Sequence, residues 1–587
     1  MTPKRKKYRA LARVYTRYVA IYSIAILVFS APFGQAQPSA PPAPRSGPST
    51  PAPATLPNLG DGNDMTPSAE RRMGDRIARE IYRDPDYIDD PVLAEYVQGI
   101  WQPLLAAARL RGELTPELDE RFAWEIMMGK DRSVNAFALP GGYFGLHLGL
   151  VAIVTSRDEL ASVMGHELTH VTQRHISRLI AKQSSQAPWM IGAMILGALA
   201  ASKSPDAANA LIIGGQAVVA QNQLNFSRDM EREADRIGFG VMTQAGFEPY
   251  GFVSMFEKLQ QASRLNDNGS FPYLRSHPLT TERISDMLSR VPPGRLAKPG
   301  GPVAAGNPQA SNQSLEHAMV TARASVLSNP GVDALRAWAP LVAGAGFGKL
   351  DLARQAAALY GAALAAMRLR DLPSATALQA KLADVIRVDS TRVDPTRADP
   401  LSADGRAARL ARLLAVEVAL AGDDARRAVT LLDANSAAAT AVLQPASGRV
   451  AASASASASV SPTPSLPVSG RPELVLSSQA LVRTGQASTA AQQLQTWVAN
   501  HPRDAQAWQL LSSAYAALGQ SLRAIRADAE AQAAHLDYAG ALDRFKAGQD
   551  LARDLSRRGA ADHIEASIID TRARQTALLL REQAVER

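Results

Sequence analysis

The stretch "GHELTHVTQRH" at residues 165–175 places two histidines four residues apart, with a glutamate directly after the first. Side chains four residues apart project from one face of a helix, so His166 and His170 can direct two imidazole nitrogens at one metal ion. Glu167 is rotated from that pair and can reach a water on the open side of the ion, as a general base does. The pattern predicts a metal-dependent hydrolytic site. The alternative is the solvated polar face of an ordinary helix.

The residues around this motif predict a helix that continues to Gln183. Ser156 and Glu159 have the spacing of a capping box at its start. Apolar residues then recur on one face at Leu160, Val163, Met164, Leu168 and Val171. In one continuous helix His175 lies about 180° around the axis from His166. We therefore expect His175 at the surface and not at the metal.

A third metal ligand has to come from elsewhere in the chain, because catalytic zinc sites usually have three protein ligands and an open position. The chain has no cysteine, so that ligand is His, Asp or Glu. The stretch "SRDMEREADRIG" (227–238) offers Glu231 and Asp235, again four residues apart. Glu231 can ligate the ion while Asp235 orients a ligand histidine through a hydrogen bond. The same spacing also suits a solvated, charged helix face.

The residues before the motif carry strand patterns. Phe122, Trp124, Ile126 and Met128 recur at every second position, which predicts a half-buried strand. The run from 135 to 154 contains two further short strand-like stretches, with a turn at Pro140-Gly141-Gly142 between them. We expect a small sheet beside the helix that carries the histidines.

The first 36 residues have the order of an export signal: a basic start, an apolar run over Tyr18–Phe33, and Ala36 at a suitable cleavage point. The alternative is an uncleaved membrane anchor, because the apolar run is long for a signal. Residues 37–63 are rich in Pro, Ala and Ser and are expected to form a linker. Two apolar pieces within 188–220 are each shorter than the about 20 residues that span a bilayer. We expect core helices there, with peripheral contact to a membrane surface as the alternative.

The charge balance gives no reason to expect nucleic acid as a partner. Lys and Arg total 63 and Asp and Glu total 55, so the formal net charge is only +8. No cluster of Lys and Arg occurs in the body of the chain, whereas nucleic-acid binding needs a basic patch.

The second half of the chain is predicted to be helical and partly repetitive. Linkers are expected at 293–312, which is rich in Pro and Gly, and at 444–471, which is of low complexity. They separate an α-helical, repeat-like region at 313–443 from a helical domain at 472–587. In that domain the following residues fit a 34-residue helix–turn–helix repeat: Leu481, Gly485, Ala490, Trp508, Leu511, Tyr515, Gly519 and Ala524. Such repeats bind partner proteins, and the alternative is a plain helical bundle without a ligand.

Three motifs in this order resemble one family. HELTH, the ExxAD core of 227–238, and "SHPLTTERI" (276–284) together resemble the HtpX/CAAX-prenyl-protease (Ste) type of zinc metallopeptidase. The likeness is greatest to its exported bacterial, BepA-like members with tetratricopeptide repeats. It is strong over 65–290 and loose over the repeats. It implies an α+β fold that is mainly α, with a gluzincin-type metallopeptidase domain and small sheet at 64–292 followed by the helical repeat region.

The resemblance also implies a role for each site residue. It implies one Zn²⁺ per subunit, held by His166, His170 and Glu231, with Glu167 as the general base. Asp235 is implied to orient a ligand or donate a proton. The resemblance further implies that His277 reaches the zinc or the transition state, that Arg283 is the arginine that follows it, and that an extended substrate adds to the strand edge at Asn135, Ala136 and Phe137.

The function implied by the resemblance is that of a metalloendopeptidase in the bacterial periplasm. It would hydrolyse misfolded or stalled outer-membrane proteins, and its repeats would bind substrate or the outer-membrane assembly machinery. The alternative function is a chaperone or assembly scaffold with a latent peptidase site. The alternative location is the inner membrane, through an uncleaved signal.

Overall fold

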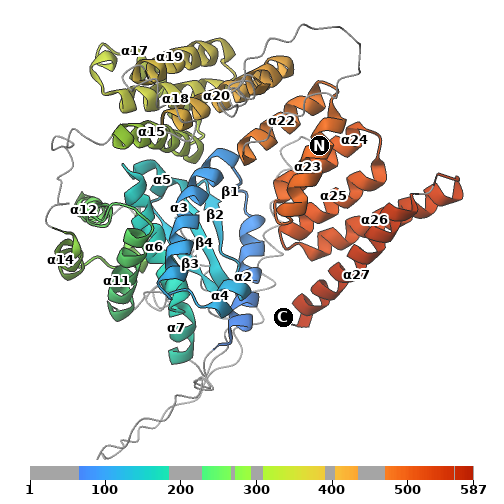
Figure 1. Ribbon diagram of the computed structural model, residues 1–587, viewed down its shortest axis with the longest axis horizontal. Coiled ribbons are helices and arrows are strands. Elements are labelled where there is room, and N and C mark those ends of the chain that lie inside the picture. Colours follow the sequence, from blue (N-terminus) through green and yellow to red (C-terminus); the bar gives the residue numbers. More distant parts are fainter. Residues whose placement is uncertain are drawn as a thin grey trace, which may run out of the picture. The chain divides into compact units, whose positions relative to one another are not determined.

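The computed structural model describes residues 65–183, 228–265, 271–292, 308–390, 403–433, 470–560 and 562–585 (Figure 1). The predictions for the signal, for the first linker and for the apolar pieces within 188–220 lie outside these residues. In the described part, helices predominate and the strands form one small sheet. This confirms a mainly helical protein with a small sheet. None of the described helices has the length and apolar composition needed to cross a membrane.

The sheet has four strands in the order β1-β2-β4-β3. They are β1 (Tyr87–Ile88), β2 (Glu125–Gly129), β3 (Ala136–Leu139) and β4 (Tyr143–His147). The pair β2–β4 is parallel, and the other two pairs are antiparallel. Strand β2 begins later than the alternating pattern predicted, because Trp124 has a left-handed backbone conformation (φ 51°) that interrupts an extended chain.

The predicted turn at Pro140–Gly142 is present as a short 3₁₀ segment, η1, between β3 and β4. Gly142 has a φ of 83°, which costs a glycine little. A Cβ atom at this position would lie 2.7 Å from the Cβ of Phe122, so a larger residue would also clash. The turn brings the chain back beside β3, so that β3 is the last strand of the sheet in the described residues.

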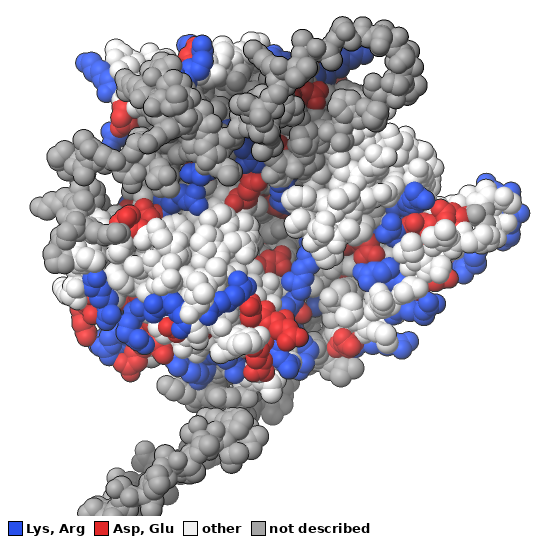
Figure 2. Space-filling model, viewed as in Figure 1, with Lys and Arg blue, Asp and Glu red and all other residues white. Residues whose placement is uncertain are grey.

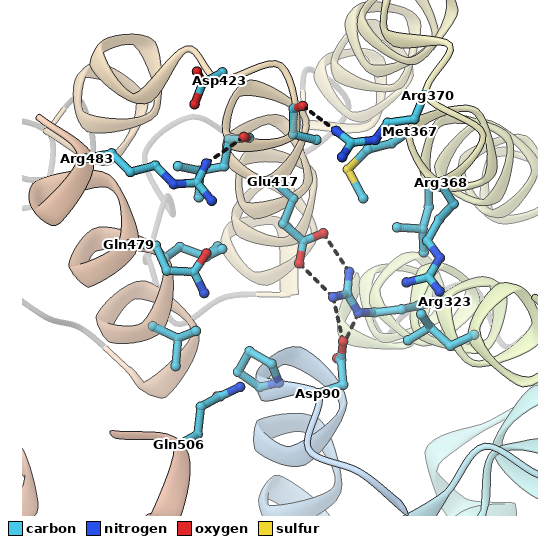
Figure 3. A pocket seen from close by; sticks show the side chains of 17 residues that line it. Asp90, Arg323, Met367, Arg368, Arg370, Glu417, Asp423, Gln479, Arg483 and Gln506 are labelled. Carbon is cyan, nitrogen blue, oxygen red and sulfur yellow. Dashed lines mark hydrogen bonds and ion pairs between the residues drawn. The ribbon is translucent and has the colours of Figure 1, made fainter. Parts of the chain in front are cut away.

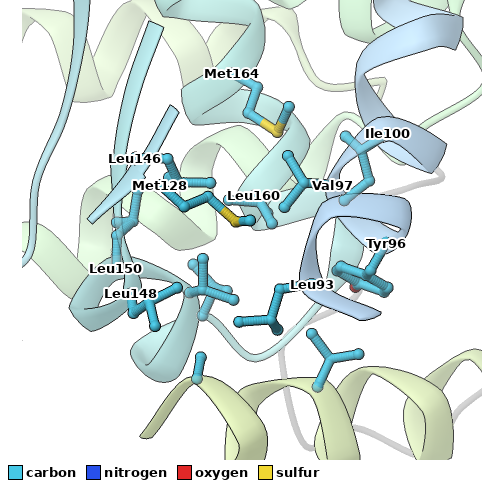
Figure 4. Packing of buried hydrophobic residues seen from close by; sticks show 14 of the residues in the cluster. Leu93, Tyr96, Val97, Ile100, Met128, Leu146, Leu148, Leu150, Leu160 and Met164 are labelled. Carbon is cyan, nitrogen blue, oxygen red and sulfur yellow. The ribbon is translucent and has the colours of Figure 1, made fainter. Parts of the chain in front are cut away.

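The described residues up to 292 are called the first half of the chain below. Their core lies between the sheet and two helices, α3 (Pro91–Leu110) and α6 (Arg157–Thr172). Figure 4 shows Leu93 and Ile100 of α3 facing Met128 and Leu146 of the strands, with Leu160 of α6 between them. Each such side chain contributes about 1.5–3 kcal/mol when fully buried. This packing fixes one face of α6.

Helix α11 (Arg228–Gln244) packs directly on α6. The backbones meet at two glycines. A Cβ atom on Gly238 would lie only 2.9 Å from the carbonyl oxygen of Gly165, and one on Gly165 would lie 3.2 Å from the carbonyl oxygen of Gly238. The absence of both side chains allows the close approach of the two helices that carry the predicted metal ligands.

The remaining helices surround this core and build the second half of the chain (Figure 1). Those of the first half are α2 (Pro67–Tyr82), α4 (Pro116–Arg121), α5 (Leu148–Ile153), α7 (His175–Gln183), α12 (Tyr250–Leu265), α13 (Tyr273–Ser276) and α14 (Thr281–Arg290). The middle of the chain contains α15 (Pro308–Ser328), α16 (Val332–Arg336), α17 (Ala339–Ala343), η3 (Phe347–Lys349), α18 (Leu352–Arg368), α19 (Leu372–Ser390) and α20 (Ala403–Ala421).

The last helices come in pairs, and the first two pairs repeat with a constant spacing. They are α22 (Arg471–Arg483), α23 (Ala487–Asn500), α24 (Ala505–Ala517), α25 (Ser521–Ala534), α26 (Tyr538–Arg557) and α27 (His563–Val585). Helices α22 and α24 begin 34 residues apart, as do α23 and α25. Gly485 and Gly519 occupy the corresponding turns with φ values of 80° and 70°.

Three arginines of the helical second half of the chain (residues 308–585) hold the start of α3, and each binds one carboxylate at or directly before the first turn of α3 and one carboxylate of the second half. They are Arg323 with Asp90 and Glu417, Arg409 with Glu95 and Glu473, and Arg471 with Asp89 and Asp504. Forked guanidinium groups suit such paired contacts. These contacts form one of the connections between the second half of the chain and the first.

A cavity of about 790 Å³ lies beside these contacts, between α15, α18, α20 and α22 (Figure 3). Two of the arginines that line it donate to backbone carbonyls at the end of α20: Arg370 to Ala421 at 3.0 Å and Arg483 to Leu420 at 2.8 Å. Cations at a helix C-terminus stabilise it. Most of the charge around the cavity therefore serves to hold helices together.

Candidate metal centre

Four side chains from three parts of the chain meet inside the first half. His166 and His170 come from α6, Glu231 from α11, and His277 from the residue after α13. Each offers one ligand atom, and these atoms all lie within 4.8 Å of one another. All four side chains are buried. The helix prediction for 227–238 and the convergence of its Glu231 with the histidines are therefore both present in the structure.

The nitrogen and oxygen atoms converge on one point. His170 Nε2 lies 3.0 Å from His166 Nε2, and His277 Nδ1 lies 3.3 Å from the same atom. Glu231 Oε1 lies 3.0 Å from His277 Nδ1 and 3.5 Å from His170 Nε2. A single cation at this point would be within reach of all four groups.

The chemistry of these groups fits zinc, which binds imidazole nitrogens and carboxylate oxygens. One carboxylate oxygen of the cluster, Glu167 Oε1, is buried and makes no hydrogen bond to any described residue, whereas Glu231 Oε2 forms an ion pair with Arg283 Nη1 at 2.9 Å. Buried carboxylate oxygens without hydrogen bonds are costly and call for a cation. The residues of the cluster therefore fit the metal that the sequence implied.

Glu167 lies beside the cluster and connects it to the sheet. Its Oε2 accepts a hydrogen bond of 3.0 Å from the backbone N–H of Ala138 in β3. Its Oε1 lies 3.5 Å from His277 Nε2. Burial raises the pKa of Glu167 above its usual value. A carboxyl with a raised pKa is suited to taking up and returning a proton.

Asp235 and Arg283 support His166 from behind. Asp235 Oδ1 lies 3.0 Å from His166 Nδ1, the nitrogen that faces away from the cluster. Arg283 donates two hydrogen bonds to the same carboxylate, of 2.6 and 2.7 Å. Burial alone would raise the pKa of Asp235, but the hydrogen bonds from Arg283 and His166 outweigh it and lower the pKa. Asp235 is thus an anion that orients one histidine of the cluster.

The charges within the cluster act strongly on one another. Burial, followed by the charge of His166, holds the pKa of His170 well below its usual value. Burial would lower the pKa of His166 as well, but hydrogen bonds to Asp235 and Glu231 raise it to about 9. Asp235 and Glu231 therefore stabilise the protonated, positively charged form of His166.

His175 is buried and not at the surface, so that prediction was wrong. Helix α6 ends at Thr172, and Arg174 has a φ of 52°, which breaks the helix and starts α7 at His175 in a new direction. The chain turns back, and His175 Nδ1 lies 2.8 Å from His170 Nδ1. The predicted position of His175 around the helix axis assumed one continuous helix, so it does not apply beyond such a break. Burial lowers the pKa of His175 to about 4.

Comparison with known proteins agrees with this geometry. The model of peptidase family M48 matches residues 94–291, which include every residue of the cluster. Residues 94–291 belong to peptidase family M48. The remaining described helices after residue 291 lie outside the match.

Relatives of the M48 domain carry consistent names. The beta-barrel assembly-enhancing protease of Escherichia coli is 31% identical over 320 residues, which are 53% of this chain and 59% of the relative. A Vibrio cholerae protein with the same name in provisional form is 36% identical over 250 residues, 42% of this chain and 50% of the relative. The mitochondrial metalloendopeptidase OMA1 of Saccharomyces cerevisiae is 28% identical over 201 residues, 33% and 55%. The chain spans about half to three fifths of the length of these relatives.

The predicted substrate edge of the M48 domain lies on β3. The backbone N–H of His147 donates to the carbonyl of Asn135 at 3.0 Å, and Phe137 is paired with Gly145. Hydrogen-bonded and non-hydrogen-bonded pairs alternate in an antiparallel ladder. The backbones of Asn135 and Phe137 therefore face β4, whereas those of Ala136 and Ala138 face the open side.

Some residues of the centre were missed in the sequence. Tyr273 stacks on the ring of His277, with centroids 4.7 Å apart. Glu233 lies 3.0 Å from His175 Nε2 and was not separated from the other carboxylates of its helix.

The expected capping box at the start of α6 is also displaced. Ser156 accepts from the N–H of Glu159, but the Glu159 carboxylate accepts from Thr155 and not from Ser156.

Proposed function

We propose that this chain is a zinc-dependent metalloendopeptidase of the bacterial cell envelope that acts on misfolded or stalled outer-membrane proteins. One observation carries the proposal: a buried cluster of three imidazoles and a carboxylate lies beside Glu167, whose free carboxylate oxygen makes no hydrogen bond. The M48 match supports the peptidase activity, and the names of the bacterial relatives support the substrate class.

In this proposal His166, His170 and Glu231 hold one Zn²⁺ per subunit, and Asp235 and Arg283 keep His166 in place. Zinc, when bound, acidifies water and polarises a carbonyl group. Glu167 takes the proton of the attacking water on Oε1, while the N–H of Ala138 holds Oε2 still. The same carboxyl then returns the proton to the leaving amine.

The substrate is proposed to bind as an additional strand along β3. Ala136 presents backbone groups to the open side, and Asn135 and Phe137 fix the strand to β4 from the other side. Main-chain hydrogen bonds of this kind accept many sequences. Because Ala138 also binds Glu167, an added strand would lie within reach of the general base.

The repeat helices are proposed to bind protein, either substrate or the outer-membrane assembly machinery. We propose tetratricopeptide-like repeats for 472–587, supported by the 34-residue spacing of their helices. Helices α23 and α24 contain no Lys, Arg, Asp or Glu, and Figure 2 shows a broad uncharged surface over the repeats. A surface without cations suits protein and not nucleic acid.

We propose the periplasm as the location, reached through the signal at 1–36, with an uncleaved inner-membrane anchor as the alternative. The proposed domains are the linker 37–63, the peptidase domain 64–292, the linker 293–312, the helical region 313–443, the linker 444–471 and the repeat domain. Peripheral membrane contact through residues 188–220 remains part of the proposal.

The second candidate function, a scaffold with a latent peptidase, is favoured by the position of His277. A catalytic zinc needs an open position, which three protein ligands leave and four do not. His277 Nδ1 lies close enough to Glu231 and His166 to act as a fourth ligand. In a latent enzyme His277 would have to leave before substrate enters.

Glu167→Gln tests the proposed function. We expect cleavage of fluorescein-labelled casein to fall by about 10²–10⁴-fold, because a general base contributes that much. Zinc content and thermal stability should stay unchanged. Full cleavage by this variant, or a purified protein without zinc, would overturn the proposal.

His277→Ala separates the two candidates. A catalytic His277 predicts a lower cleavage rate at equal zinc content. If His277 blocks the site, the His277→Ala variant should cleave casein faster than the wild-type protein.

A further inference from the structure

We propose that His175 is a positioning residue of the metal centre, which holds His170 in place through its Nδ1 atom and is itself held by Glu233. The inference rests on the proposed zinc site and deepens it. It concerns the residue that directly follows the helix break at Arg174.

The contacts form a continuous series. His170 Nδ1 lies 2.8 Å from His175 Nδ1, and His175 Nε2 lies 3.0 Å from Glu233 Oε2. Arg178 donates to the same carboxylate oxygen at 2.8 Å. Both histidines are 0% exposed. Their rings are nearly perpendicular, at 77°, with centroids 4.8 Å apart, so the contact is directional and not a stacked pair.

Metal binding determines which nitrogen donates in each contact. His170 turns Nε2 towards His166 and Glu231 in the cluster. A neutral imidazole that offers Nε2 as a ligand carries its hydrogen on Nδ1. His170 therefore donates to His175 Nδ1, and His175 carries its own hydrogen on Nε2 and donates it to Glu233. Each contact of the series then has one donor and one acceptor.

The two histidines on α6 thus have different supports. His166 faces a carboxylate, Asp235, whereas His170 faces an imidazole. A charge count gives a reason for the difference. Glu167, Glu231 and Asp235, when ionised, carry three negative charges, which Arg283 and a divalent ion balance. A neutral support for His170 keeps that balance, and Glu233 is paired with Arg178.

Replacement of His175 by Asn or Leu tests the inference in the full chain. The Oδ1 of Asn can occupy the place of Nδ1 and accept the hydrogen bond, whereas Leu has no acceptor. We expect His175→Leu to weaken zinc binding by about 10–100-fold, the usual effect of losing such a partner. The His175→Asn variant should lose clearly less zinc affinity than His175→Leu. Zinc affinity is measured by competition with a chromophoric chelator.

His317→Leu is the matched control, because His317 is also buried and makes two hydrogen bonds but lies outside the cluster. It should lower thermal stability and leave zinc affinity unchanged. If His175→Leu does not fold, His175→Gln replaces it, since the longer side chain moves its amide away from the Nδ1 position. Asn should then bind zinc more tightly than Gln.

The inference fails if His175→Leu binds zinc within twofold of the unchanged protein, or if Asn gives no rescue relative to Leu or Gln. A merely structural role would lower the melting temperature of the metal-free protein and leave zinc affinity alone. Failure of the proposed function looks different: the unchanged protein would bind zinc and cleave no casein, while the order of zinc affinities would still hold. An unchanged protein that binds no zinc overturns both.

Discussion

Among the described residues, two clusters of buried charge differ in how completely their polar atoms are paired. One is the metal centre around His166 and Glu231. The other is formed by Arg323 with Asp90 and Glu417 at the start of α3 (Figure 3). Both bring groups together from helices that are distant in the sequence, and both are shielded from water.

The Arg323 cluster leaves no donor unused. The five N–H donors of its guanidinium make five hydrogen bonds: two to Asp90, two to Glu417 and one to the hydroxyl of Tyr360. Asp90 also accepts from the N–H of Leu93 and caps α3. A cluster with all its polar atoms paired has nothing left to offer a ligand.

The metal centre is paired less completely. Asp235 and His175 contact the outward nitrogens of the two α6 histidines, while Glu167 Oε1, on the inside, makes no hydrogen bond to any described residue. Leaving a buried carboxylate oxygen unpaired costs about 1–3 kcal/mol or more, a cost that a bound cation removes. The unpaired atoms therefore distinguish a site that binds from a cluster that only holds helices together.

Arg323→Met should have the largest effect on folding. It leaves the Asp90 and Glu417 carboxylates without their arginine, and breaking a buried ion pair in this way costs about 3–5 kcal/mol. We expect the free energy of unfolding, measured by urea titration, to fall by that amount. The zinc affinity of the folded protein should not change, because no atom of this cluster reaches the metal centre.

The triple variant Asp90→Asn, Arg323→Met, Glu417→Gln is the control for this prediction. It removes all three charges together, and Asn still caps α3. It should be more stable than Arg323→Met alone. A triple variant as unstable as the single one would show that packing, and not unpaired charge, is responsible.

Arg283→Lys should act on metal binding more than on folding. Lysine cannot make the two parallel hydrogen bonds to Asp235, so the carboxylate loses its orientation and His166 with it. We expect zinc affinity to fall by about 10–100-fold, with a smaller loss of metal-free stability than Arg323→Met produces. Equal zinc affinity would contradict the role of Asp235 as an orienting anion.

The last prediction concerns His317, a buried histidine outside the metal centre. Burial lowers its pKa from 6.5 to about 4. Between these values the unfolded chain binds a proton that the folded chain does not, so stability falls as pH falls from 6.5 to 4. The slope is at most about 1.4 kcal/mol per pH unit for one group. Urea titrations of His317→Leu across this range should show a flatter pH dependence.

A matched substitution at exposed His563 should leave that pH dependence as it is. A flattening in both variants would mean that the slope does not arise from His317.

The convergence of the motif residues could be predicted from the sequence because their chemistry is carried by fixed spacings. His166 and His170 share a helix face, and Glu231 is the acid at the matching place on a second helix. His175 could not be placed in this way, since a single left-handed residue, Arg174, reverses the inference from helical angles. No pattern in the neighbouring sequence predicts that Arg174 has a left-handed backbone conformation.

The contacts of Arg323 could not be predicted either. Its partner Asp90 is 233 residues away, and one arginine among many gives no signal of its own. Spacing within one helix can be read from a sequence, whereas pairing between distant helices depends on how the whole chain packs.

The contact between Gly165 and Gly238 has a consequence for metal selectivity. Zinc requires its ligand atoms about 2.0–2.2 Å away, a narrow tolerance. The separation between the α6 ligands and Glu231 is determined by two residues without side chains, neither of which touches the metal. A methyl group at either position would force backbone against backbone and widen the site. Redesign of the site for a larger ion should therefore begin with the distance between α6 and α11 and not with the proposed ligands.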